Sequence, residues 1–278
     1  MRLRSPYSQN PPALIRQVAA FTLLELLVVM SIIGILAGMV VGLAPAAATK
    51  MKEARVRTEL QQLVLLIEAY KTRFGVYPPD GVQRISVAGQ GFQTVSNPAL
   101  SPLFYELSGV YLTNAASSDG YFIPRADADD GDGIRSAELQ TWFGREGILN
   151  AKPYELRNRL FVTDFKEGQY AEVFRNRSDA GYADLEVLAV GFSSDASGKR
   201  VNGLAWPNNR TDHPVPSNKG LNPWRYVSTN PTNNPGGFDL WAEIPVGRDR
   251  VKIIGNWKES NYRSLDSQFP IPIPDPIF

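Results

Sequence analysis

The densest group of side chains that could do chemistry lies in residues 127–138, DADDGDGIRSAE. If the first aspartate is position one of a calcium loop, carboxylates fall at positions one, three and twelve, and an isoleucine falls at position eight. The middle departs from an EF-hand, because Gly131 stands at position five and an aspartate at position six. Aspartates this close repel one another unless a cation lies between them. The segment therefore predicts a calcium site, with another hard cation or a solvated acidic turn as the alternatives. The candidate ligands are Asp127, Asp129, Asp130, Asp132 and Glu138.

A second candidate for chemistry is Glu25, the only ionisable residue in the apolar segment 21–44, FTLLELLVVMSIIGILAGMVVGLA. A charge at such a position costs about 2.5 to 3.5 kcal/mol to insert into a membrane, so the carboxylate needs a partner. If the chain is cut before Phe21, the new amino group lies one helical turn from Glu25, and the positive end of the helix dipole favours the same charge. The amine of a neighbouring chain is an equally good partner.

The element that must position Glu25 is long enough to cross a membrane. At about 1.5 Å per residue, the segment extends roughly 36 Å, against a hydrocarbon core of about 30 Å. A secretory signal has a shorter apolar core and is cut after it, whereas here the small residues Ala19 and Ala20 precede the run. We therefore expect a transmembrane helix over residues 21–44. A plain signal anchor would explain the length but not the acid.

Small residues followed by Phe21-Thr-Leu-Leu-Glu25 and a long apolar run closely resemble the processing site of type IV pilins and pseudopilins. The resemblance implies that a prepilin peptidase cuts between Ala20 and Phe21 and methylates the new amine. It also implies that Glu25 guides docking of the mature helix into a filament. The family usually has glycine before the cut, where this chain has Ala20.

Beyond the apolar segment, residues 50–74 show an amphipathic helical pattern. Apolar residues recur every three or four positions, and they are Val56, Leu60, Leu63, Ile67, Tyr70 and Phe74. Gly75 and the two prolines that follow predict the end of this helix. Residues 21–74 could thus form one long helix, in which Pro45 removes a backbone donor and favours a bend.

Other segments resemble the major pseudopilins of type II secretion more specifically. Residues 70–79, YKTRFGVYPP, look like the junction between the long helix and the head. Residues 222–228 (NPWRYVS), 237–241 (GFDLW) and 255–257 (GNW) are similar to the C-terminal hairpin of that family. Asp239 falls near the place where the family binds a stabilising calcium, but the loop that follows in the family is replaced here by residues 243–247, EIPVG.

The pattern of residues in the same C-terminal region predicts strands independently of the resemblance. Trp224 and Tyr226, then Phe238, Leu240 and Ala242, alternate on either side of an Asn/Pro/Gly turn, which is a hairpin signal. Residues 251–254 could add a third strand. Between junction and hairpin, residues 85–220 form a large insertion, for which we expect a short helix at 102–109, a strand at 186–192 and many loops.

Composition excludes several classes of function. The chain has 278 residues, no cysteine, and 29 Lys and Arg against 28 Asp and Glu, a formal net charge of +1. This balance gives no reason to expect a nucleic acid partner, and the absence of cysteine excludes disulfides and thiolate catalysis. A Ser-His-Asp arrangement would have to depend on His213, in an Asn/Pro-rich loop, so we expect no enzyme. The polar group Ser193, Ser194, Asp195 and Ser197 is typical of a turn.

These observations predict an α+β protein in which a long N-terminal helix, first transmembrane and then amphipathic, packs on a small antiparallel sheet with a large loop-rich insertion. We expect a leader at 1–20, the transmembrane helix at 21–44, its extramembrane half at 45–75 and a globular head at 76–278. Charges on the two sides of the apolar segment are close to balanced. The resemblance therefore decides the orientation, with a single pass through the inner membrane and the head in the periplasm.

The resemblance implies a structural pseudopilin subunit that assembles into a periplasmic filament for protein export. Its partners would be the prepilin peptidase, other pseudopilin subunits, both copies of itself and minor subunits, and an assembly platform in the inner membrane. One alternative is a type IV pilus subunit for adhesion or DNA uptake. Another is a membrane-tethered, calcium-dependent binding module that never polymerises.

Overall fold

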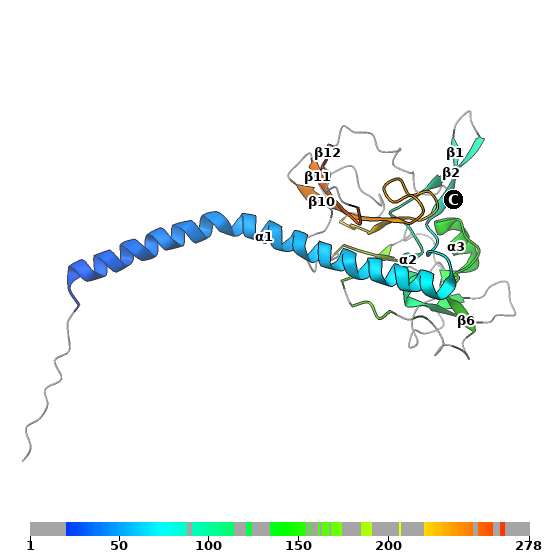
Figure 1. Ribbon diagram of the computed structural model, residues 1–278, viewed down its shortest axis with the longest axis horizontal. Helices are drawn as coiled ribbons and strands as arrows, with labels where there is room; N and C mark the ends of the chain where they lie inside the picture. The colour runs from blue at the N-terminus through cyan, green and yellow to red at the C-terminus, as the bar shows by residue number, and fades with distance from the viewer. Residues whose placement is uncertain are drawn as a thin grey trace, which may run out of the picture. The chain divides into compact units, whose positions relative to one another are not determined.

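The computed structural model (Figure 1) describes residues 21–87, 91–113, 121–123, 134–153, 156, 161, 163–166, 168–173, 185–190, 206, 220–246, 250–257 and 262–264. At some positions it describes the backbone alone, among them residues 40–49, 82–87, 91–96 and 262–264. The chain divides into two compact units, Met1–Lys50 and Met51–Phe278.

The N-terminal part of the described chain is one helix, α1 (Leu23–Phe74). Pro45 lies within the helix and does not end it. The first turn carries an acid and the last turn carries Lys71 and Arg73, charges that match the helix dipole. Gly75 ends the helix with a φ of 80°, and its backbone N–H donates to the Lys71 carbonyl at 2.7 Å. The expected long helix and its expected end are confirmed.

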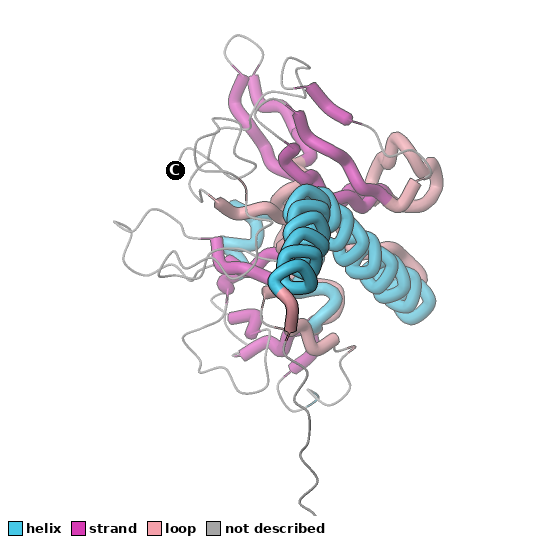
Figure 2. Tube along the Cα trace, turned by 90° about the vertical axis from the view of Figure 1, so that its left-hand side faces the viewer, coloured by secondary structure: helices cyan, strands magenta, loops and turns pink. Residues whose placement is uncertain are grey.

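The C-terminal half of α1 supplies one wall of the core of the head. Its buried side chains have exposed fractions of 0 to 6%, and they are Val56, Leu60, Leu63, Ile67 and Tyr70. These are the positions that the three- and four-residue spacing predicts. The sixth predicted residue, Phe74, is only partly buried, and its ring lies 4.4 Å from that of Tyr70. In Figures 1 and 2, strands of the head lie on opposite sides of this half of the helix.

The C-terminal strands form an antiparallel sheet in the order β12-β11-β10-β9. The strands are β9 (Arg225–Val227), β10 (Asp239–Val246), β11 (Arg250–Gly255) and β12 (Tyr262–Ser264). Leu240 pairs with Tyr226 across the sheet, and Ala242 pairs with Ile254. All four side chains are fully buried, because the period-two pattern directs them into the core. The expected hairpin and its third strand are confirmed.

The described residues of the expected insertion form two short helices and several strands of the head. The helices are α2 (Leu103–Ser108) and α3 (Ser136–Phe143). One sheet has the order β5-β4-β3-β6 and contains β3 (Val110–Thr113), β4 (Tyr121–Ile123), β5 (Ile134–Arg135) and β6 (Ala151–Pro153). Two antiparallel pairs are β1 (Val82–Val87) with β2 (Gly91–Ser96), and β7 (Tyr170–Val173) with β8 (Leu185–Leu188).

The insertion shares the core of the head and is not a separate domain. Phe104, Leu107, Trp142 and Phe143 are buried in the same apolar cluster as Tyr70 of α1. The short helix expected at 102–109 is α2. Of the strand expected at 186–192, β8 covers the beginning, while residues 191 and 192 lie outside the described part of the chain.

Candidate functional site

Glu25 lies in the first turn of α1, where its carboxylate closes the helix N-terminus. Its Oε2 accepts hydrogen bonds from the backbone N–H and the hydroxyl of Thr22, both at 2.9 Å. The Thr22 hydroxyl oxygen in turn accepts the backbone N–H of Glu25 at 3.2 Å. This reciprocal pair is a capping box, with Thr22 as the N-cap residue and Glu25 as the third residue of the helix.

The capping box bears on the expected role of Glu25 in two ways. Its groups all belong to Thr22 and Glu25, so a cut before Phe21 leaves the box intact. The box also uses only Oε2, and no hydrogen bond from another described residue reaches Oε1. One carboxylate oxygen can therefore order the helix while the other accepts an amine from outside the chain.

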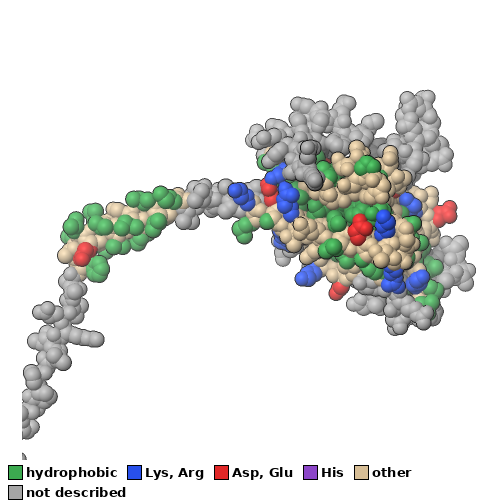
Figure 3. Space-filling model, viewed as in Figure 1, with side chains coloured by type: hydrophobic (Ala, Val, Ile, Leu, Met, Phe, Trp, Pro, Cys, Tyr) green, Lys and Arg blue, Asp and Glu red, His purple; other side chains and the backbone are tan. Residues whose placement is uncertain are grey.

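The helix surface from residue 21 to residue 39 is apolar and unburied. Every side chain in this range is exposed, and most side chains on the face seen in Figure 3 are apolar. The large apolar side chains here are 44 to 86% exposed, and they are Phe21, Leu23, Leu24, Leu26, Leu27, Val28, Val29, Met30, Ile32, Ile33, Ile35, Leu36 and Met39. A soluble monomer rarely exposes so large an apolar surface, so this one requires a cover of lipid or of other protein.

Two glycines on this surface leave room for a close neighbour. Gly34 and Gly38 lie four residues apart and so share one side of the helix. A Cβ atom added at either would meet no atom within 4 Å. Small residues at this spacing allow two helix backbones to approach closely in a membrane.

No helical run among the described side chains is long and apolar enough to cross a membrane. The span expected at residues 21–44 continues beyond those side chains, since only the backbone is described at residues 40–49.

Of the expected calcium ligands, Asp127, Asp129, Asp130 and Asp132 lie outside the described residues. Glu138 is the third residue of α3 and is 2% exposed. One of its oxygens, Oε2, accepts the backbone N–H of Arg135 at 2.8 Å, whereas Oε1 is buried and meets no hydrogen-bond donor in the described part. The described residues contain no group of three or more metal-binding side chains. The calcium site stays a prediction.

Other expected positions also lie outside the described residues. They are Ala20 at the cut, His213, and the polar group Ser193, Ser194, Asp195 and Ser197. Phe21 is described, and its side chain is 76% exposed.

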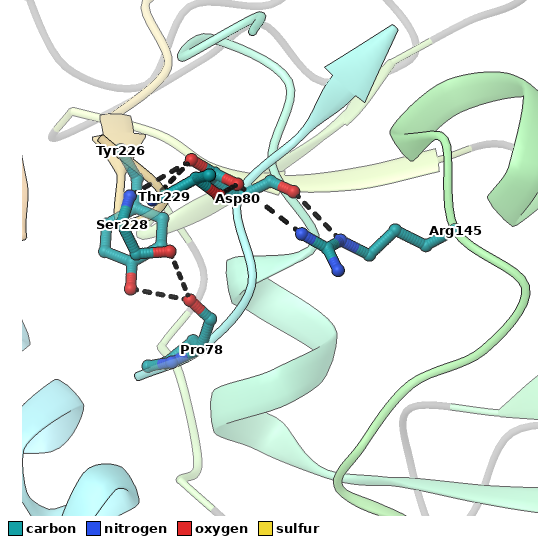
Figure 4. Close-up of polar contacts among 6 residues, drawn as sticks. All are labelled: Pro78, Asp80, Arg145, Tyr226, Ser228 and Thr229. Carbon is teal, nitrogen blue, oxygen red and sulfur yellow. Dashed lines mark hydrogen bonds and ion pairs between the residues drawn. The ribbon is translucent and has the colours of Figure 1, made fainter. Parts of the chain in front are cut away.

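Asp80 forms a junction between the end of α1 and the C-terminal sheet that the sequence did not predict (Figure 4). Its side chain is fully buried, and Oδ2 accepts the backbone N–H groups of Ser228 and Thr229 at 3.1 and 3.0 Å. The Thr229 hydroxyl donates to Oδ1 at 2.6 Å, and an Arg145 nitrogen lies 3.5 Å from the same oxygen. The nearby Pro78 carbonyl accepts the hydroxyls of Tyr226 and Ser228 at 2.8 and 2.9 Å.

Glu106 forms a second buried junction, between α1 and the insertion. Its Oε2 accepts the Tyr70 hydroxyl at 2.8 Å and the Asn150 backbone N–H at 3.0 Å, and its Oε1 accepts the Leu149 backbone N–H at 2.9 Å. Burial raises the pKa of Glu106 above its ordinary value, and these hydrogen bonds offset part of the rise. The raised pKa therefore reflects burial at a structural junction, where the carboxyl group holds α1 against α2.

A hollow of about 790 Å³ lies beside these two junctions. Lys71 and Arg145 line it, and the exposed apolar side chains of Val76 and Leu149 also face it. The lining hydroxyls of Ser228 and Thr229 already donate to Pro78 and Asp80, as described above. The lining therefore holds the loops in place and presents no activated nucleophile among the described residues.

The described geometry is that of a protein with a capped, exposed apolar N-terminal helix and an α+β head. Residues 15–41 match the prokaryotic N-terminal methylation motif. The chain thus carries the prepilin-type cleavage and methylation signal that marks type IV pilin-like proteins and pseudopilins. No curated protein and no solved structure matches the chain.

Proposed function

We propose that this protein is a non-enzymatic structural subunit of a filament of the type II secretion kind, stored in the inner membrane with its head in the periplasm. The observation that carries the proposal is the methylation motif at 15–41, which overlaps the exposed apolar surface at 21–39. The part of these two features whose side chains are described, residues 21–39, is exposed and supplies no buried core residue. Both are accounted for if the helix leaves lipid to pack against other helices.

Assembly follows from the chemistry of the helix N-terminus. Prepilin peptidase removes the leader, and the amine of Phe21 becomes available to a carboxylate. Glu25 keeps Oε2 in the capping box while Oε1 accepts the amine of a neighbouring subunit. The apolar side chains around Glu25 exclude water from this pair, which strengthens their attraction relative to the same pair in solvent. The assembly platform and minor subunits would act on this end of the protein.

Support for a secretion filament comes from the residues that resemble the major pseudopilins. Gly255 has room for no side chain, since a Cβ atom there would lie 2.6 Å from the Trp257 ring. The Trp257 ring packs against that of Trp241, with 5.9 Å between centroids. The hydrogen bond from the Tyr226 hydroxyl to the Pro78 carbonyl joins the hairpin to the helix junction. The residues that resemble those of the major pseudopilins therefore make packing and hydrogen-bond contacts that stabilise the head.

The test is loss and recovery of function in the source cell. Deletion of the gene should abolish export of a secreted protein, and expression of the wild-type chain should restore export together with filaments that contain the mature chain. Loss of surface pili, adhesion or DNA uptake with normal export would favour the type IV pilus alternative. Export restored by a chain that never enters filaments would favour the tethered binding module.

We also propose calcium binding by the acidic segment 127–138. The specific support is Glu138. It lies in the first turn of α3, and it corresponds to the ligand at position twelve of an EF-hand loop. Its buried Oε1 lacks a donor among the described residues, and a buried carboxylate oxygen without a donor is costly unless a cation or a proton compensates for it. Ile134, at the tether position, is 2% exposed and belongs to β5. The carboxylates would provide hard oxygen ligands to the ion.

A further inference from the structure

Asp239 begins β10 at the end of the long turn that follows β9, and it is 3% exposed. The resemblance to secretion pseudopilins implies a stabilising calcium near this residue. The residues around its carboxylate test whether a cation fits there. Oδ2 accepts the backbone N–H of Asn233 at 2.8 Å and its side-chain amide at 3.0 Å. Oδ1 accepts the backbone N–H of Asn234 at 2.9 Å and its side-chain amide at 3.1 Å.

These four contacts use the whole capacity of the carboxylate. An ionised Asp has two oxygens with about four acceptor sites, and here each site faces an N–H group. Calcium binds oxygen atoms and not N–H groups. The positive ends of the Asn233 and Asn234 N–H dipoles point at the oxygens that a cation would need. A cation at Asp239 would have to displace two backbone donors, which would then be left without an acceptor.

The orientation of the Asn234 side chain follows from its surroundings. Its Nδ2 lies within 3.1 Å of three acceptors, which are Asp239 Oδ1, the Phe238 carbonyl and Asn256 Oδ1. An amide oxygen at that place would face three other oxygens, so the amide nitrogen must occupy it. The two backbone donors from Asn233 and Asn234 do not depend on this assignment.

Asn256 ties the turn to the end of β11. Its Oδ1 accepts the Leu240 backbone N–H at 3.0 Å as well as the Asn234 amide, and its Nδ2 donates to the Phe238 carbonyl at 2.9 Å. Its backbone N–H donates to the Leu240 carbonyl at 3.0 Å. One side chain after β11 thus fixes the start of β10 and the turn before it.

We propose that the turn between β9 and β10 is a metal-independent clasp, in which amide groups of Asn233 and Asn234 take the place of a cation at Asp239. Asn256 positions the clasp against β11. The shape of this turn is then independent of calcium. A calcium response of the head would originate elsewhere in the chain. The inference rests on hydrogen bonds within the head and does not depend on the filament function.

The test is hydrogen exchange of the turn in the full chain, held in detergent micelles. Mass spectrometry would follow deuterium uptake of a peptide covering residues 229–240, in chelator and in millimolar calcium. The clasp predicts the same uptake in both conditions, because the Asp239 carboxylate protects the Asn233 and Asn234 amides without metal. Slower uptake in calcium, abolished by Asp239→Asn, would overturn the proposal.

The Asp239→Asn variant adds a second readout. Its side chain keeps one acceptor and places an NH₂ group against donors, so exchange of the turn should accelerate by about tenfold or more, equally with and without calcium. Acceleration only in calcium would identify a cation site and contradict the clasp. Asp164→Asn, at an exposed position, removes the same charge and should leave exchange of the turn unchanged. If Asp239→Asn does not fold, the comparison with and without calcium is made in Asp129→Ala with Glu138→Ala, and slower exchange of the turn in calcium in that variant would overturn the proposal.

Discussion

The Tyr70 hydroxyl of α1 donates a hydrogen bond of 2.8 Å to Glu106 of α2, and both residues are buried in the core of the head. The bond joins the long helix to the insertion across 36 residues of sequence. The C-terminal half of α1 is thus held to the head by a buried polar contact as well as by its apolar face.

Replacing Tyr70 by Phe should lower the free energy of unfolding of the head, and by more where Glu106 is ionised than where it is protonated. Burial raises the pKa of Glu106 above the ordinary 4.5, so the group favours folding most below that value and loses its contribution as pH rises through the folded pKa. The Tyr70 hydroxyl opposes this loss, because it stabilises the ionised form. Its removal should cost about 1.5 to 3 kcal/mol when Glu106 is charged, and less when it is protonated.

Denaturant unfolding of wild type and Tyr70→Phe over a series of pH values, from about pH 4 upward across the range in which the head stays folded, measures this difference. Tyr77→Phe is the matched control, because its hydroxyl meets the exposed Glu68 at 3.2 Å and should matter little at either pH. An equal penalty for Tyr70→Phe at every pH of the series would show that the hydroxyl does not act through the charge of Glu106.

The capping box allows the two roles of Glu25 to be separated. Glu25→Gln keeps a side chain that can close the box but removes the charge, whereas Thr22→Ala removes the cap and keeps the charge. We expect Glu25→Gln to reduce filament incorporation sharply and to insert into the membrane at least as well as wild type. Thr22→Ala should cost about 1 kcal/mol of helix stability and leave most incorporation intact.

Incorporation would be measured as the ratio of mature chain in sheared filaments to mature chain in the membrane. Similar loss in both variants would mean that Glu25 acts through the cap. Normal incorporation of Glu25→Gln would remove the charge-pairing account of assembly.

Calcium should stabilise the folded protein through the acidic segment. A cation that binds only the folded state adds about 2.7 kcal/mol at a hundredfold excess over its dissociation constant. Millimolar calcium should therefore raise the melting temperature of the full chain, magnesium should raise it less, and Asp129→Ala with Glu138→Ala should abolish the rise. Asp164→Ala is the control for loss of an acidic charge. A rise that persists in the double variant would place the ion elsewhere, and no rise at all would leave a solvated acidic turn.

Local patterns in the sequence predicted local structure well. The spacing of Val56, Leu60 and Ile67 identified the buried face of α1, because a helix brings such residues to one side by its own geometry. Alternation around Tyr226 and Leu240 identified the paired strands β9 and β10 for the same kind of reason. The Thr-x-x-Glu pattern of a capping box is also present in the sequence, at residues 22–25, although Glu25 was assigned only an amine as its partner, either that of Phe21 or that of a neighbouring chain.

Contacts between distant segments left no such pattern. Asp80 binds Thr229 across 149 residues, and nothing near either residue in the sequence indicates the other. Glu106 gave no signal because a lone glutamate in a short helix is usually exposed. Asp239 was linked to calcium through the family resemblance, and its amide partners became visible only when the turn was folded around it.

Processing of the N-terminus is the step on which the proposed filament assembly depends most, and mass spectrometry of the chain produced together with a prepilin peptidase measures it directly. We expect a mature protein that begins at Phe21 and is heavier than that sequence by one methyl group. Recovery of only the intact chain from Met1, or of a chain cut after Ala44, would contradict this expectation.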